Sequence, residues 1–196
     1  MINLLENKNE QINDGVLVIN IKESIDDIYK IDFSSLDCSK IVINLFENVK
    51  ASFLNVVSKT DVHVEFNLQD YASLTYNVAS FDVDNDNDVL VNMEGQESVF
   101  DGSYADFSKG ENKFKLDCHL RGRGSNAHWH LASLTKNDDK KAFEISFYHY
   151  ARNTYAKMSN YGVCEDESHL SFLGTSRIFK GCKESRLSLL DNFPLV

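Results

Sequence analysis

Residues 149–164 read HYARNTYAKMSNYGVC, and residues 171–185 read SFLGTSRIFKGCKES. A histidine opens this stretch, a threonine and a serine follow it, and a Gly-Val strand, an aromatic-x-Gly strand and a small turn come next. The marker residues are His149, Thr154, Ser159, Gly162-Val163, Phe172-x-Gly174, Gly181-Cys182 and Ser185. Each marker is degenerate alone, so the information lies in their order and spacing.

Alternating apolar and polar residues extend outward from this stretch over most of the chain. Val62, Val64, Phe66 and Leu68 alternate with polar residues, and the segments 114–120 and 143–149 show the same period. This period predicts half-buried β-strands. Strands recur about every ten to twenty-five residues with turn residues between them, which is typical of a sandwich, a barrel or a β-solenoid. Periodicity alone leaves these three architectures open.

The marker residues resemble those of the SufB/SufD family, the β-helical core proteins of the SUF iron–sulfur cluster assembly machine. Looser turns carry the resemblance back along the chain, at residues 47–51, 71–76 and 120–126, so that it covers about residues 40–190. The resemblance implies an all-β fold, a right-handed parallel β-helix (a β-solenoid). In such a fold, neighbouring coils stack and bury a continuous core between them.

The expected organisation is a single domain over residues 1–196, with an N-terminal arm or cap over 1–35 and the coils of the β-helix over 36–196. Ser24 to Ser34 could form a short helix, with Ser24 as its cap and two aspartates in its first turn. We expect the last coil, near 185–196, to be covered by the N-terminal arm or by a second copy of the chain.

Composition narrows the function. The formal net charge is −10, which disfavours a nucleic-acid partner, and the nearest basic cluster is only Arg121-Gly-Arg123. The sequence has neither an apolar run of about 20 residues nor a signal peptide, so we expect a cytoplasmic protein that does not enter a membrane. The four cysteines (Cys38, Cys118, Cys164 and Cys182) are far apart and are expected to be thiols.

The resemblance also suggests where cluster chemistry could lie. Cys164, Cys182 and His149 are the candidate ligands, because thiolates bind iron–sulfur clusters. In the B-type subunit a scaffold cysteine follows the final turn, but the corresponding position here is about Asp191. The N-terminal cysteine motif and the C-terminal helical region of that subunit have no counterpart either. The chain therefore resembles a shortened D-type subunit, with no intrinsic cofactor and at most a transient cluster in a complex.

The expected function is that of a non-enzymatic subunit or accessory in iron–sulfur cluster assembly, acting by protein–protein interaction. Its expected partners are the SUF ATPase subunit (SufC-like) and the B-type subunit, with a homodimer as a further possibility. The chain contains neither a P-loop nor a nucleophile elbow. A module that kept the fold and lost the cluster chemistry fits the sequence equally well.

Two metal sites remain as alternatives. His128 and His130 would face the same side of a strand and could bind one ion, as in a small cupin-like β-barrel enzyme. The third ligand is missing, because Leu134 and Thr135 stand where glutamate would be expected; otherwise both histidines face solvent and Trp129 lies in the core. The acidic stretch 82–88 resembles the start of a calcium loop, but Asn87 replaces its glycine and Met93 its glutamate. A solvated hairpin-like loop is the simpler interpretation.

Overall fold

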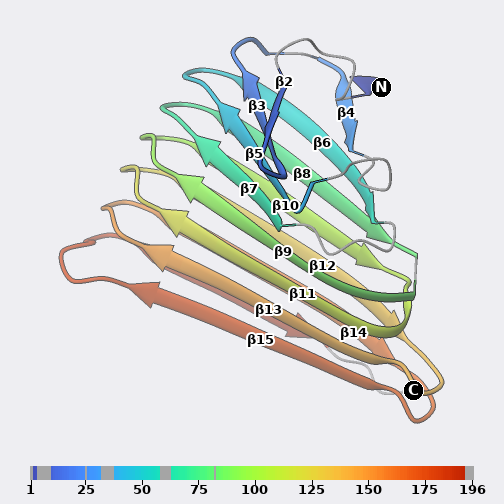
Figure 1. The fold of residues 1–196 in the computed structure, drawn as a ribbon. Helices are drawn as coiled ribbons and strands as arrows, with labels where there is room; N and C mark the ends of the chain where they lie inside the picture. The colour runs from blue at the N-terminus through green and yellow to red at the C-terminus, as the bar shows by residue number, and fades with distance from the viewer. Residues whose placement is uncertain are drawn as a thin grey trace.

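The computed structural model describes residues 2–3, 10–24, 26–31, 38–57, 63–81 and 83–192. These residues form sixteen β-strands and no helix (Figure 1). The strands are β1 (Ile2–Asn3), β2 (Glu10–Asn13), β3 (Val16–Ile21), β4 (Ile28–Ile31), β5 (Lys40–Leu45), β6 (Lys50–Val57), β7 (His63–Leu68), β8 (Ser73–Ser80), β9 (Val83–Met93), β10 (Val99–Asp106), β11 (Lys109–Leu120), β12 (Asn126–Thr135), β13 (Lys140–His149), β14 (Tyr155–Cys164), β15 (His169–Ile178) and β16 (Arg186–Asn192).

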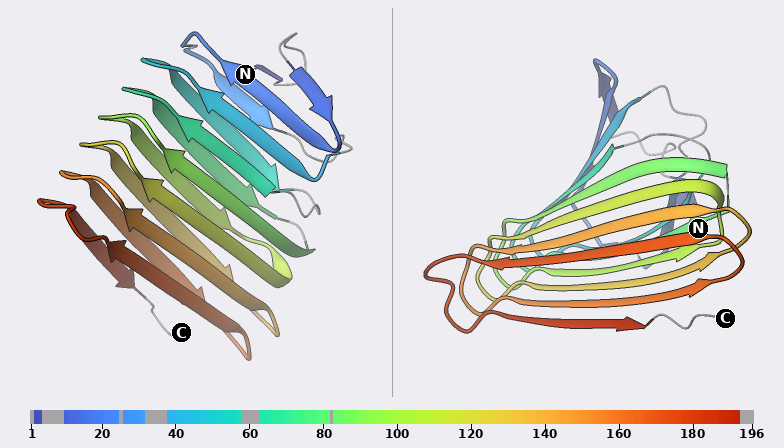
Figure 2. Two further views of the ribbon diagram at one scale, coloured as in Figure 1. Left: turned by 60° about the vertical axis from the view of Figure 1, so that its left-hand side comes forward. Right: turned by 90° about the horizontal axis from the view of Figure 1, so that it is seen from below.

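From β3 onward, successive strands alternate between two eight-stranded sheets. The first sheet has the order β1-β4-β6-β8-β10-β12-β14-β16, and the second β15-β13-β11-β9-β7-β5-β3-β2. Every pairing is parallel except that of β2 with β3. Figure 2 shows the sheets as two facing layers that turns connect at both sides. This arrangement is a β-solenoid, which confirms the predicted fold class; a cupin-like barrel is wrong, because two separate parallel sheets do not close into an antiparallel barrel.

The interior of the solenoid is built from columns of stacked apolar side chains. Successive side chains of a strand face opposite sides, so every second residue points inward. In-register pairing then places equivalent inward residues of neighbouring coils on top of one another. One such column contains Ile19, Ile43, Phe66, Val91, Cys118 and Phe147, and all six side chains are buried.

The outer face of the second sheet carries a ladder of asparagines. Asn20, Asn44, Asn67 and Asn92 occupy one register position on four neighbouring strands. Each of the last three donates its amide to the preceding residue, at 2.9, 3.0 and 2.9 Å. The ladder satisfies side-chain amides along the solenoid axis, as stacked asparagines do in cross-β structures. It therefore fixes the register of the early coils from outside the core.

The coils lengthen along the chain. Lys40 pairs with His63, 23 residues later, whereas Tyr155 pairs with Arg186, 31 residues later. The strands of the second sheet lengthen too, from 6 residues in β3 to 12 in β11. This drift explains why the sequence shows no sharp repeat period.

One corner of the solenoid is built from six tight turns, from the turn between β5 and β6 to the turn between β15 and β16. One residue of each turn has a positive φ: Asn48, Tyr71, Glu97, Gly124, Asn153 and Glu184. The amide of each of the first five donates to a carbonyl of the following turn, for example Tyr71 to Gln96 at 2.9 Å and Glu97 to Arg123 at 2.8 Å. The looser turn motifs of the sequence, at 47–51, 71–76 and 120–126, are these corner turns or run from them into the next strand.

The N-terminal segment differs from the expectation in three ways. Residues 28–31 form β4 instead of part of a helix, because Tyr29 is buried and stacks on Phe53 at 5.2 Å between ring centroids. Parallel coils already include β3 and β4, within the segment assigned to an arm or cap over 1–35. Finally, β1 and β2 lie at the opposite end of the sheets from β15 and β16, so the described part of the N-terminal segment does not cover the last coil.

The acidic stretch 82–88 also differs from the expectation of a solvated hairpin-like loop. From residue 83 onward it belongs to β9, which pairs in parallel with β7 and β11, so it is not a hairpin-like loop. Within the described residues, no helix is long and apolar enough to cross a membrane.

The interior of the first sheet leaves no room for a side chain at Gly102. This residue faces inward on β10 and pairs with Trp129 on β12. A Cβ atom at Gly102 would lie 2.5 Å from Trp129 Cε3 and 2.6 Å from Phe100 Cζ. Trp129 is fully buried and stacks on Phe114 at 5.4 Å. The tryptophan ring therefore occupies the space above the glycine.

Gly102→Ala should destabilise the protein by about 1–3 kcal/mol, because the buried rings cannot move away from the added methyl group. Urea denaturation monitored by circular dichroism measures this change. The outward neighbour Asp101→Ala should change the free energy of unfolding by less than about 0.5 kcal/mol. An increase in stability for Gly102→Ala, the result for an unstrained glycine, would contradict this packing.

Candidate functional site

Two of the predicted site residues, His149 and Cys182, lie at the corner turns of the last two coils. His149 ends β13, and its side chain is fully buried. Its Nδ1 lies 2.7 Å from Thr154 Oγ1, which donates to Ser185 Oγ at 2.8 Å, and Ser185 in turn donates to the carbonyl oxygen of Ala151 at 3.0 Å. Because both hydroxyl hydrogens are used in this chain of hydrogen bonds, the proton on the His149 ring is assigned to Nδ1.

The other ring nitrogen of His149 has no partner. Nε2 is buried and makes no hydrogen bond among the described residues. Burial lowers the pKa of His149 below its ordinary value, since a charged imidazolium would lose its hydration there. The ring is therefore neutral near pH 7, with an unprotonated nitrogen facing the interior.

Cys182 contacts the backbone of His149 and not its ring. The thiol is buried and donates to the His149 carbonyl oxygen at 3.2 Å. The structure thus places the Cys182 thiol beside the backbone of His149, and among the described residues no hydrogen bond joins this thiol to the imidazole ring. The pair joins two coils at this corner.

Cys164 lies at the other corner of the solenoid. Its Sγ is 3.3 Å from the carbonyl oxygen of Ser168 and 3.2 Å from Ser168 Oγ. Thr154 immediately precedes β14, and Cys164 is the last residue of β14. The length of this strand therefore separates the Cys164 thiol from the His149 corner. Among the described residues, no disulfide joins any of the four cysteines.

His128 and His130 lie on the outer face of β12, with Trp129 between them in the core. Asp101 is the register partner of His128 on β10. Partial burial lowers the pKa of His128, and the nearby Asp101 carboxylate acts in the opposite direction. Across the described ranges, no three His, Cys, Asp or Glu side chains are placed to hold a metal ion together; Asp82 of the calcium hypothesis lies outside those ranges.

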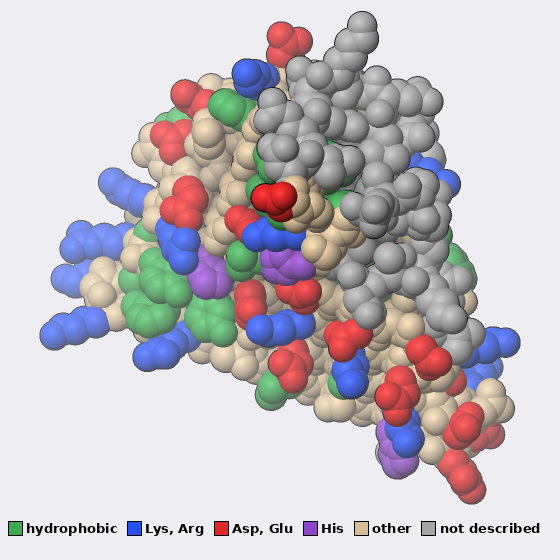
Figure 3. Space-filling model, in the orientation of Figure 1, with side chains coloured by type: hydrophobic (Ala, Val, Ile, Leu, Met, Phe, Trp, Pro, Cys, Tyr) green, Lys and Arg blue, Asp and Glu red, His purple; other side chains and the backbone are tan. Residues whose placement is uncertain are grey.

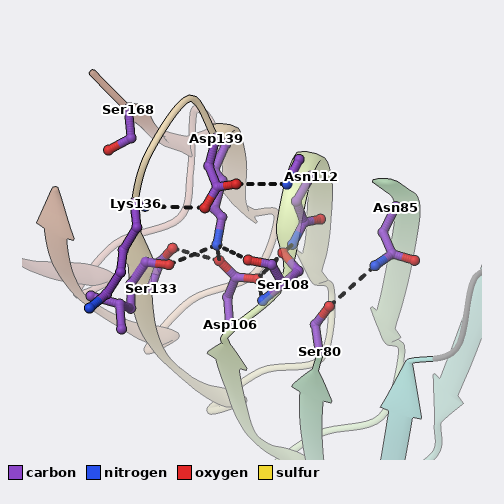
Figure 4. Close-up of polar contacts among 12 residues, drawn as sticks. Ser80, Asn85, Asp106, Ser108, Asn112, Ser133, Lys136, Asp139 and Ser168 are labelled. Carbon is purple, nitrogen blue, oxygen red and sulfur yellow. Dashed lines mark hydrogen bonds and ion pairs between the residues drawn. The ribbon is translucent and has the colours of Figure 1, made fainter. Parts of the chain in front are cut away.

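Sequence reasoning missed a buried ion pair near the start of β13, at the opposite end of that strand from His149. Lys141 Nζ lies 2.9 Å from Asp106 Oδ2, and neither side chain is exposed. Figure 4 shows the surrounding network, in which Ser133 and Ser108 each donate to Asp106 at 2.6 Å and Asn112 donates at 2.8 Å. The available signal was the strand period, which puts Asp106 and Lys141 at inward positions that are otherwise mostly apolar.

Every hydrogen of the buried ammonium group is used. Besides Asp106, Lys141 Nζ donates to the carbonyl oxygens of Ser108 at 2.7 Å and Leu134 at 2.8 Å. A buried charge pair is tolerated only when additional hydrogen bonds replace its lost hydration. With all its hydrogens bound, Lys141 is not available as a nucleophile or base, so this network is structural and connects β10, β12 and β13.

A comparison with protein families matches residues 30–192 to the family described as "SUF system FeS cluster assembly, SufBD core domain". The match includes the His149 corner, the buried ion pair and the coils from β5 onward. No curated protein matches the chain.

The buried His149 should make stability depend on pH. Its pKa in the folded state lies below that of the unfolded chain, so the unfolded state binds the proton first as pH falls. The wild type should therefore lose up to about 1.4 kcal/mol per pH unit below the ordinary histidine pKa, and His149→Gln should lose less. Urea denaturation between pH 7.5 and 5 tests this, with the exposed His169→Gln as the control; equal slopes for the wild type and His149→Gln would contradict it.

Breaking the buried pair should be costly. Asp106→Asn and Lys141→Met should each destabilise the protein by about 3–5 kcal/mol, and the double variant by clearly less than their sum. The exposed pair Lys136–Glu165, at 2.9 Å, is the matched control and should show a coupling energy below about 1 kcal/mol. Additive losses at Asp106 and Lys141 would show that the two charges do not stabilise each other.

Proposed function

The chain belongs to the SufBD core family of the SUF system for iron–sulfur cluster assembly, and we propose that it acts there as a D-type subunit through protein–protein contacts and not as an enzyme. Its proposed partners are the B-type subunit and the SUF ATPase. The observation that carries this proposal is the open face of the coil formed by β15 and β16.

Two apolar side chains of this last coil, those of Ile178 and Leu189, face the interior but remain about half exposed. Ile178 pairs with the buried His149, and Leu189 with the buried Met158, so both lie on the inward side of their strands. They are nevertheless 47% and 51% exposed. Covering them would contribute about 1 kcal/mol each, half of what full burial of such a side chain provides.

The edges of both sheets are open at the same end. Within the described residues, β15 pairs only with β13, and β16 pairs only with β14. Unpaired edge strands with apolar side chains offer a ready site for strand addition by another chain. A B-type subunit, which shares the solenoid fold in this family, is the partner whose own coils could continue both sheets.

The thiols of the chain suit an accessory better than a scaffold. Asp191 occupies the position where the resemblance places the scaffold cysteine of the B-type subunit. Cys182 is buried with its hydrogen donated to a carbonyl, and Cys164 lies at the opposite corner. We propose that a cluster passes through the complex as cargo, held chiefly by the partner.

The test is size-exclusion chromatography with light scattering on mixtures of this protein with the SUF ATPase and B-type subunit of its own organism. The wild type should form a stable complex, and Ile178→Lys/Leu189→Lys should lose it, since lysine on an edge strand blocks pairing. The control Ile28→Lys/Val99→Lys changes two apolar residues of similar exposure elsewhere and should retain the complex. Circular dichroism confirms that both variants fold.

Failure of the wild type to form any complex would overturn the proposal and favour a diverged module that kept the fold alone. Equal behaviour of the two lysine variants would show that the open coil is not the contact surface. A wild-type complex with itself, also lost in Ile178→Lys/Leu189→Lys, would identify a second copy as the occupant and would contradict the B-type assignment.

A further inference from the structure

The corner turns change charge from one end of the solenoid to the other. Backbone hydrogen bonds between consecutive turns align the residue before each positive-φ position. From the turn between β5 and β6 to the turn between β15 and β16, these aligned residues are Glu47, Asp70, Gln96, Arg123, Arg152 and Lys183. The same corner is thus acidic in the early coils and basic in the late coils.

Three cations on consecutive coils are unfavourable for stability. Neighbouring strands of a sheet lie about 4.8 Å apart, so the backbones of Arg123, Arg152 and Lys183 follow one another at about that distance. All three side chains are exposed, and none forms an ion pair with a described residue. Like charges at directly opposed positions destabilise a sheet. Folding alone therefore gives no reason for this ladder of cations.

Aromatic rings hold two further guanidinium groups beside the ladder. Tyr150 stacks on Phe179 at 4.5 Å between ring centroids. Arg121 lies over the Tyr150 ring at 5.1 Å, and Arg177 lies over the Phe179 ring at 4.7 Å. Figure 3 shows the resulting concentration of Lys and Arg side chains, with hydrophobic side chains beside them, along the left-hand edge of the molecule.

Acidic residues offset only part of this charge. Glu94 pairs with Arg121 at 2.6 Å, and Glu97 and Glu184 lie in the turns of the same corner. Against these three stand six cations: Arg121, Arg123, Arg152, Arg177, Lys180 and Lys183. A net positive corner on a chain of net charge −10 is a strong local departure from the rest of the molecule.

We propose that this basic corner binds an acidic segment of a partner protein, a short extended stretch rich in Asp and Glu. Arginine guanidinium groups match carboxylates in a bidentate geometry. Arg177 is already positioned on the Phe179 ring, whereas Arg121 is occupied by Glu94. The ladder of three coils spans about 10 Å, and alternate side chains of an extended peptide lie about 7 Å apart, so two carboxylates fit it. This surface differs from the open coil face and does not depend on the SUF partners.

Single-stranded nucleic acid fits the corner less well. Proteins that bind it offer free aromatic faces on which bases stack. Here His119 stacks over Tyr150 at 5.6 Å and Phe179 lies at 4.5 Å, so neighbouring rings occupy the faces of Tyr150. A long polyanion would also meet the acidic early coils, at Glu47 and Asp70, whereas a short acidic segment would not.

Fluorescence anisotropy with a labelled octa-glutamate peptide at low salt tests the proposal, with a labelled twelve-nucleotide oligothymidylate as the second probe. Arg123→Glu/Arg152→Glu/Lys183→Glu should weaken peptide binding at least tenfold relative to the wild type. The matched control Lys109→Glu/Lys113→Glu/Lys140→Glu changes net charge equally at exposed lysines elsewhere on the surface and should change binding less than twofold. Circular dichroism confirms folding of both variants.

Equal weakening of peptide binding in the two charge-reversed variants would overturn the proposal. It would show that the peptide is attracted by the overall charge of the protein and not by a specific site. So would an absence of peptide binding by the wild type. Tighter binding of the oligothymidylate that depends on Arg123, Arg152 and Lys183 would replace the acidic protein segment with a nucleic-acid partner. Because the probes contain no SUF subunit, these results do not depend on whether the complex with the B-type subunit forms.

Discussion

Each coil of this solenoid can bury its interior only against the coil before it and the coil after it, because a two-stranded coil has no core of its own. Parallel in-register pairing is therefore the constraint that governs every other feature. It turns the alternation of each strand into continuous columns, such as the one through Ile43, Phe66 and Val91. It also leaves the coil of β15 and β16 with half-exposed apolar side chains and, among the described strands, with an unpaired edge on each sheet.

The same constraint determines how polar groups enter the interior. An inward polar residue must find partners on its own coil or on an adjacent one, since water is excluded between the sheets. Asp106 and Lys141 meet this requirement across three strands with a complete set of hydrogen bonds. His149 meets it only in part, because Nε2 has no hydrogen-bond partner in the part of the chain that the structure describes. The corner around His149 thus holds a neutral ring in place and connects the penultimate coil to the last one.

Stacking of the coils aligns surface residues as strictly as core residues. The effect on stability is favourable on one part of the surface and unfavourable on another. Asparagines in register satisfy one another, so the ladder through Asn44 and Asn67 stabilises the early coils. Cations in register repel one another, so the ladder through Arg123 and Arg152 does not stabilise the late coils. Membership of the SufBD core family accounts for the solenoid and for its place in cluster assembly.

The sequence by itself determined the strands, because a strand's alternation is local, and the order of the markers from His149 to Ser185 indicated the solenoid and the family. It did not determine the pairing of Asp106 with Lys141, since these residues lie on different coils and nothing local links them. The sequence suggested a short helix over 24–34, because a cap residue and acidic residues near the start of a segment are local helix signals. In the structure residues 28–31 form a strand, because Tyr29 is buried against Phe53 of the next coil. Only the tertiary structure, by stacking coils of unequal length, decided which distant residues share a column and which charges share a corner.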